Sequence, residues 1–83
     1  MTRQEIMERI AAVVHDSVPE LADVELREDT VINSDLRMES MELILIICKL
    51  EALFDVRVPE RQWKKLSTLG DVVDAIYKRL PNA

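Results

Sequence analysis

The sequence SMELILIICKLEALF, residues 40–54, decides the fold of this chain. It contains no glycine or proline and is dense in apolar residues, which predicts a buried helix of about four turns. At about 100° per residue, one side of this helix carries Leu43, Ile46, Ile47, Leu50 and Phe54. The opposite side carries a second apolar row, formed by Met41, Ile44, Leu45, Cys48 and Ala52. Because a helix in a small bundle needs only one apolar row for the core, this second row needs cover from the preceding loop, a bound group or another protein.

The segment before this helix is expected to hold one helix and one long loop. Thr2 and Glu5 have the spacing of a capping box and precede a helical apolar pattern, which predicts a helix over residues 3–15. That helix must end before Pro19. Residues 16–39 lack sustained periodicity, so this long connection is expected to be functional or pinned to the core. The candidate pins are Leu21, Val24, Leu26, Val31 and Ile32.

A short third helix is expected after residue 54. Val58 and Pro59 begin it, because proline suits the first position of a helix. Trp63 and Leu66 can then close it against the core.

The last helix is expected to begin with Thr68 and Asp71, which form a second capping pair, and to end at Pro81. Its inward side is Val72, Val73, Ile76, Tyr77 and Leu80. The sequence therefore predicts a single all-α domain over residues 1–83. This domain is a small four-helix bundle with a long loop between the first two helices and a short third helix.

The net charge of the chain limits the kinds of partner that it can bind. The 83 residues hold 16 Asp and Glu against 11 Lys and Arg, a formal net charge of −5. This disfavours nucleic acid and anionic membrane surfaces and favours a basic partner. The excess lies in residues 16–42, which is consistent either with a solvated loop or with a recognition surface.

The composition also argues against an enzyme. One Cys, one His and one Gly exclude disulfide frameworks, cysteine-rich zinc sites and glycine-rich phosphate loops. His15 stands near the end of the first expected helix, where an imidazole is an ordinary structural choice, and Cys48 suits a small core or interface residue. A chain this short has little interior for a deep active site. We expect no catalytic residues and no metal ligands.

No apolar run approaches the length of a membrane span, and the first residues lead into a charged amphipathic stretch rather than a signal peptide. The sequence therefore predicts a cytoplasmic protein.

Ser40 stands where the acidic loop meets the long helix. Taken alone it suits a helix cap. Its surroundings, DLRMESM over residues 35–41, resemble the Asp-Leu-Gly-x-Asp-Ser-Leu stretch of acyl carrier proteins, in which the serine bears 4′-phosphopantetheine. The resemblance continues through the long helix, the Phe-Asp-Val-x-Val-Pro-Glu run at 54–60 and the Ser-Thr-Leu run at 67–69, and covers roughly residues 3–80.

Some positions depart from the family pattern. Arg37 replaces the glycine that precedes the serine, and Leu45 and Ala52 stand where bacterial fatty-acid carriers usually have acidic residues. Lys49 adds a positive charge. Compared with the family pattern, this helix therefore has fewer acidic residues on its recognition face. The resemblance implies that apolar contacts contribute more to the choice of partner.

The resemblance implies a carrier rather than a catalyst. A phosphopantetheinyl transferase would attach the arm to Ser40, and the arm would hold acyl groups as thioesters for fatty-acid, polyketide or related enzymes with basic or apolar docking patches. The chain itself is expected to be a monomer. The expected partner-binding residues are Glu39, Met41, Glu42, Ile44, Leu45, Cys48 and Glu51. A D-alanyl or aminoacyl carrier is one alternative, and a helical interaction module without a prosthetic group is another.

Overall fold

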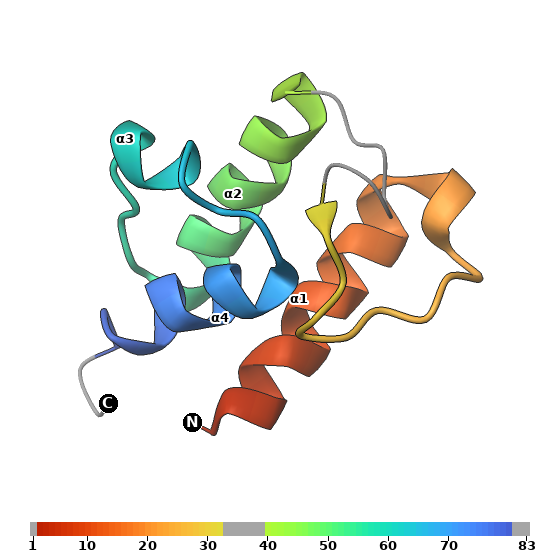
Figure 1. Ribbon diagram of the computed structural model, residues 1–83, viewed down its shortest axis with the longest axis horizontal. Helices are drawn as coiled ribbons and strands as arrows, with labels where there is room; N and C mark the ends of the chain where they lie inside the picture. Colours follow the sequence, from red (N-terminus) through yellow and green to blue (C-terminus); the bar gives the residue numbers. More distant parts are fainter. Residues whose placement is uncertain (1, 33–39, 81–83) are drawn as a thin grey trace.

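The structure is a computed structural model that describes residues 2–32 and 40–80, apart from the side chain of Ser40. The described elements are α1 (Arg3–Ser17), the 3₁₀ helix η1 (Pro19–Leu21), α2 (Ser40–Phe54), α3 (Glu60–Trp63) and α4 (Leu69–Tyr77). Both α2 and α4 pack against α1 (Figure 1). The predicted small all-α bundle with a long first connection and a short third helix is confirmed. None of the described helices is long and apolar enough to cross a membrane.

Both predicted capping boxes are present. At the start of α1 the hydroxyl of Thr2 accepts from the N–H of Glu5 at 3.1 Å, and the carboxylate of Glu5 accepts from the N–H of Thr2 at 3.2 Å. Thr68 and Asp71 make the same exchange at the start of α4, at 3.2 and 3.0 Å. α4 ends at Tyr77, earlier than predicted, and Pro81 lies outside the described residues.

The core is built from one face of each long helix. The buried residues of α1 are Ile6, Ile10 and Val14, and those of α2 are Ile46, Ile47, Leu50 and Phe54. Leu43 is half-buried and packs against the same cluster. The predicted core row of α2 is therefore confirmed. In α4 the buried residues include Val72, Val73 and Ile76, with Tyr77 and Leu80 partly buried beside them.

The turn from α2 to α3 departs from the prediction by one position. Pro59 is the residue before α3 rather than its first helical residue. Its missing N–H is no loss there, because the first N–H groups of a helix have no partner within it. As predicted, Leu66 is buried and Trp63 packs against the core.

The long loop is pinned, although not at every expected residue. Leu21 and Ile32 are buried, and Leu26 packs against the core. Val24 is exposed instead, and the prediction that its side chain acts as a pin is wrong. Its backbone holds the loop, because its carbonyl oxygen lies 2.8 Å from Nε2 of His15. The loop also contains η1, which the sequence pattern did not predict.

Backbone hydrogen bonds join the end of this loop to the start of α4. Val31 forms an isolated bridge with Thr68, and the N–H of Ile32 donates to the carbonyl of Ser67 at 2.9 Å. The N–H of Gly70 donates to the carbonyl of Glu28 at 2.7 Å. A Cβ atom added to Gly70 would lie 2.8 Å from that carbonyl oxygen, so the only glycine of the chain stands where two backbones meet.

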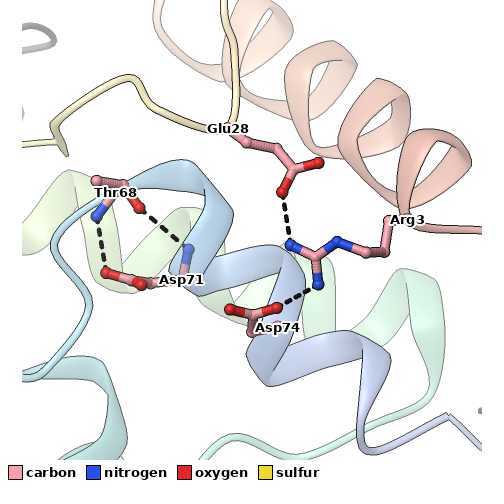
Figure 2. Close-up of polar contacts among 5 residues, drawn as sticks. All are labelled: Arg3, Glu28, Thr68, Asp71 and Asp74. Atoms are coloured by element: carbon pink, nitrogen blue, oxygen red, sulfur yellow. Dashed lines mark hydrogen bonds and ion pairs between the residues drawn. The ribbon is translucent and has the colours of Figure 1, made fainter.

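Arg3 ties three segments together beside this contact. Its guanidinium reaches from α1 to Glu28 of the loop and to Asp74 of α4 (Figure 2). The hydrogen bond to Glu28 is the largest cause that raises the pKa of Arg3, and the hydrogen bond to Asp74 is the second. The loop that runs toward Ser40 is thus held at its described end by both backbone and side-chain contacts.

Candidate functional site

The start of α2 is the place to which the sequence assigns function. α2 begins at Ser40. The first N–H groups of an α-helix have no partner within the helix, and the helix dipole places partial positive charge there. The side chain of Ser40 and the whole of Glu39 lie outside what the structure describes. The backbone therefore supplies a helix start at the residue that the sequence predicts to be modified.

The second apolar row of α2 is exposed. Met41 is 80% exposed, Leu45 51% and Ile44 43%, and Cys48 and Ala52 are also exposed. A shallow hollow of about 400 Å³ is lined by Met41, Glu42, Ile44, Leu45 and Cys48. The prediction that this row does not belong to the core is confirmed. The described part of the long loop leaves this row exposed. Among the alternatives for covering the row, that part of the loop is therefore excluded.

The charged residues that border this row have contacts within the chain. The carboxylate of Glu51 accepts from the N–H of Val58 at 2.8 Å, and Nζ of Lys49 donates to the hydroxyl of Ser17 at 2.8 Å. Glu51 is half-buried and holds the segment after α2 in place. The role of Glu51 in partner binding stays a prediction. The hydrogen bond from Val58 also gives Glu51 a structural role. The sequence pattern did not indicate this role, because the partner is a backbone group.

The described side chains offer no arrangement typical of an enzyme. His15, the only histidine in the sequence, contacts the carbonyl of Val24, and among the described residues it contacts no serine or carboxylate. Within residues 2–32 and 40–80, no group of three or more His, Cys, Asp or Glu could hold a metal ion. The pKa of Glu5 is lowered mainly by the backbone N–H of Thr2. The pKa of Asp71 is lowered mainly by the backbone N–H of Thr68 and next by that of Ser67. These shifts therefore report helix capping rather than catalysis.

The residues around the start of α2 fit a phosphate that carries an organic arm. A phosphodiester keeps a negative charge, which free N–H groups and the positive end of a helix stabilise by a few tenths to about 1 kcal/mol. The hollow beyond Ser40 is lined mainly by apolar side chains and offers a surface for uncharged parts of such an arm.

Comparison with known proteins decides the family. The model of the family described as "Phosphopantetheine attachment site" matches residues 4–76. The chain belongs to this phosphopantetheine-binding family. Its prosthetic group is 4′-phosphopantetheine, attached covalently.

Curated relatives of this phosphopantetheine-binding protein are acyl carrier proteins, which confirms the resemblance found in the sequence. The protein from Amoebophilus asiaticus is 29% identical over 76 residues, covering 92% of this chain and 94% of the relative. The protein from Thermotoga maritima is 27% identical over 79 residues, covering 95% and 96%.

Solved structures agree with the fold. A proposed acyl carrier protein from Mycobacterium tuberculosis superposes with a TM-score of 0.81 at 26% identity, covering 88% of this chain and 96% of that one. The acyl carrier protein from Enterococcus faecalis gives a TM-score of 0.76 at 25% identity, covering 95% and 99%. The phosphopantetheine-binding family is therefore matched in sequence and in fold, and membership makes this chain a carrier that works with a phosphopantetheinyl transferase and with biosynthetic enzymes.

Proposed function

We propose that Ser40 is the attachment site and that this chain carries acyl intermediates as thioesters between biosynthetic enzymes. The observation that carries the proposal is that α2 begins at Ser40, inside the region matched by the family. When bound, the arm supplies a terminal thiol that holds the acyl group. The chain itself contributes no catalytic residue and is not an enzyme.

The chemistry at Ser40 asks little of the chain. Its hydroxyl forms an ester bond to the phosphorus next to the pantetheine of coenzyme A, and the phosphoanhydride bond breaks to release adenosine 3′,5′-bisphosphate. The transferase supplies the base that takes the hydroxyl proton. What this chain must provide is access, and the 80% exposure of Met41, the next residue, supports an accessible helix start.

The second apolar row is the proposed docking surface for partner enzymes. Met41, Ile44, Leu45 and Cys48 follow Ser40 on an exposed face of α2, with Glu42 at the edge of their hollow. An apolar side chain of an enzyme that entered this hollow would remove the row from water and bring the enzyme close to the arm. Glu39, Glu42 and Glu51 would add charge attraction to a basic patch, such as that of the transferase.

Replacing Ser40 with alanine tests the attachment site. We expect Ser40→Ala to keep its helical circular dichroism and thermal midpoint, because Ala is a good helix former at the first position of α2. It should gain no mass when incubated with coenzyme A and a phosphopantetheinyl transferase, whereas the wild type gains one phosphopantetheine. Ser17→Ala, which alters a serine of α1 outside the stretch 35–41, is the control and should load normally. A pantetheine adduct on Ser40→Ala would refute the assignment.

The cargo is a separate question that the same assay can address. Intact mass of the protein purified from its native host reports both the arm and the acyl group on it. An amino acid on the arm would favour the D-alanyl or aminoacyl alternative. The monomeric state, the single domain over residues 1–83 and the cytoplasmic localisation stay predictions from the sequence.

A further inference from the structure

Residues 57–65, which we call the basic segment, hold four exposed cations around α3. Arg57, Arg61, Lys64 and Lys65 are all exposed, and Glu60 is the only acidic residue among them. In the part of the chain that the structure describes, these four side chains take part in no hydrogen bond or ion pair. Other cations, such as Arg3 and Lys49, do have partners. The basic segment thus has an excess of positive charge that no ion pair with another described residue neutralises.

The positive surface is separated from the acidic part of the molecule. Residues 16–25 contain four acidic residues and no basic one, and they lie at the opposite end of the long axis from α3 (Figure 1). That axis is 33 Å long. Charges interact over a Debye length of only about 8 Å at physiological salt, so the acidic end does not screen the basic segment. A partner that approaches α3 therefore meets a positive surface, although the whole chain carries −5.

The four cations do not contribute to the packing that holds α3. Leu66 is buried and Trp63 packs against the core, and the N–H of Val58 is held by Glu51 of α2. Like charges gathered within nine residues repel one another, and Glu60 is the single carboxylate within the basic segment that offsets this repulsion. An external anionic surface would relieve this repulsion. The Val58–Glu51 contact also keeps the basic segment against α2, the helix that begins at Ser40.

We propose that the basic segment is a second docking surface, whose partner is an acidic protein surface on the enzymes that receive the loaded arm. This proposal rests on the carrier function proposed above. A small acidic patch can pair with the basic segment alone. An extended polyanion such as a lipid surface would also meet the acidic residues and the net charge of −5, which oppose it.

Two docking surfaces of opposite sign would sort the partners of the carrier. A basic transferase is attracted to the acidic residues near the start of α2, and an acidic enzyme is attracted to the basic segment. Each is repelled by the surface that attracts the other. Charge then helps to decide which enzyme associates at which stage, in addition to the apolar contact on α2.

Fluorescence of Trp63, the only tryptophan, reports binding at the basic segment directly. We would titrate the loaded protein at low salt with a deca-glutamate peptide, and in parallel with vesicles of phosphatidylglycerol. Saturable binding of the peptide is expected, with weaker binding to the vesicles. The double variant Arg61→Gln/Lys64→Gln should bind the peptide about five- to tenfold more weakly, as expected for two exposed charge pairs. The control Arg9→Gln/Lys78→Gln makes the same change in net charge elsewhere and should stay within about twofold of wild type.

Equal peptide affinity in the wild type and in Arg61→Gln/Lys64→Gln would overturn the proposal, as would tighter binding to the vesicles than to the peptide. Intact mass of each sample shows whether Ser40 carries its arm. A failure to load would count against the proposed function, whereas normal loading without peptide binding would count only against the basic segment.

A second experiment tests the kind of partner in the native host. A photo-cross-linking amino acid at Glu60 lies among the cations without removing any of them. The expected cross-linked peptide belongs to an acyl-processing enzyme and is rich in Asp and Glu. A neutral or basic cross-linked peptide, or one whose yield is unchanged in the Arg61→Gln/Lys64→Gln background, would contradict the proposal.

Discussion

Replacing Gly70 with alanine is predicted to destabilise the protein, although the same exchange inside a helix usually does the opposite. Gly70 is the second residue of α4, and alanine in a helix interior is favoured over glycine by about 1 kcal/mol. Here the added methyl would lie 2.8 Å from the carbonyl oxygen and 3.3 Å from Cβ of Glu28. The first of these atoms is backbone and cannot move aside by changing a rotamer. The loop or α4 must therefore shift.

The size of the effect follows from two losses and one gain. Forcing a methyl into a filled space costs about 1–3 kcal/mol, and weakening the Gly70–Glu28 hydrogen bond costs about 0.5–1.5 kcal/mol. The helix propensity of alanine returns about 1 kcal/mol. We therefore expect a net loss of about 0.5–3.5 kcal/mol in the free energy of unfolding. For a domain of this size each kcal/mol lowers the thermal midpoint by about 4–8 °C.

Urea unfolding followed by Trp63 fluorescence and by circular dichroism measures this change. The control is Ala12→Gly, the reverse exchange at an exposed position inside α1, which should cost about 0.5–1 kcal/mol from propensity alone. If Gly70→Ala stabilised the protein by about the amount that Ala12→Gly destabilises it, the close approach at Glu28 would have no energetic weight. Faster hydrogen exchange at the N–H groups of residues 32 and 70 would show that the loop has been released.

Two further predictions concern charge. The backbone N–H groups of Thr68 and then, more weakly, of Ser67 lower the pKa of Asp71. The ionised carboxylate therefore contributes fully to stability above its unfolded pKa of about 4, and this contribution is lost as the pH falls through the lower pKa of the folded state. The urea midpoint should drop below pH 4, and Asp71→Ala should reduce that drop. Glu42→Lys should slow association with the phosphopantetheinyl transferase at low salt, and stopped-flow kinetics would measure the rate. Glu8→Lys on α1 makes the same charge change elsewhere and serves as the control. Unchanged kinetics for Glu42→Lys would show that charge at this position does not contribute to docking.

Local patterns predicted most of the fold. The two capping boxes depend on residues three positions apart, and the two rows of α2 depend on the helical period, so both can be read from a short window of sequence. The assignment of Ser40 as the attachment site rests on its neighbours in the sequence, through the resemblance to carrier proteins, and stays a proposal. The structure adds that α2 begins at this residue and that the row beyond it is exposed.

Apart from η1, whose hydrogen bonds are local, the main features that the sequence did not predict depend on contacts between residues that are not neighbours in the sequence. Arg3 bonds to partners 25 and 71 positions away, and no local pattern links them. The need for glycine at position 70 comes from a loop carbonyl that crosses the start of α4. Val24 is apolar yet exposed, because the loop is held there by its backbone rather than by its side chain.

The exposure of the second apolar row separates function from stability at the proposed docking surface. Met41 and Leu45 are at least half exposed, so polar replacements there remove little buried area and should leave the free energy of unfolding almost unchanged. Ile47 and Leu50 on the other side of the same helix are buried, and replacing either with alanine costs about 2–5 kcal/mol. A loss of partner binding at Ile47 or Leu50 could therefore reflect unfolding. A loss at Met41 or Leu45, with an unchanged thermal midpoint, can only be assigned to the surface itself.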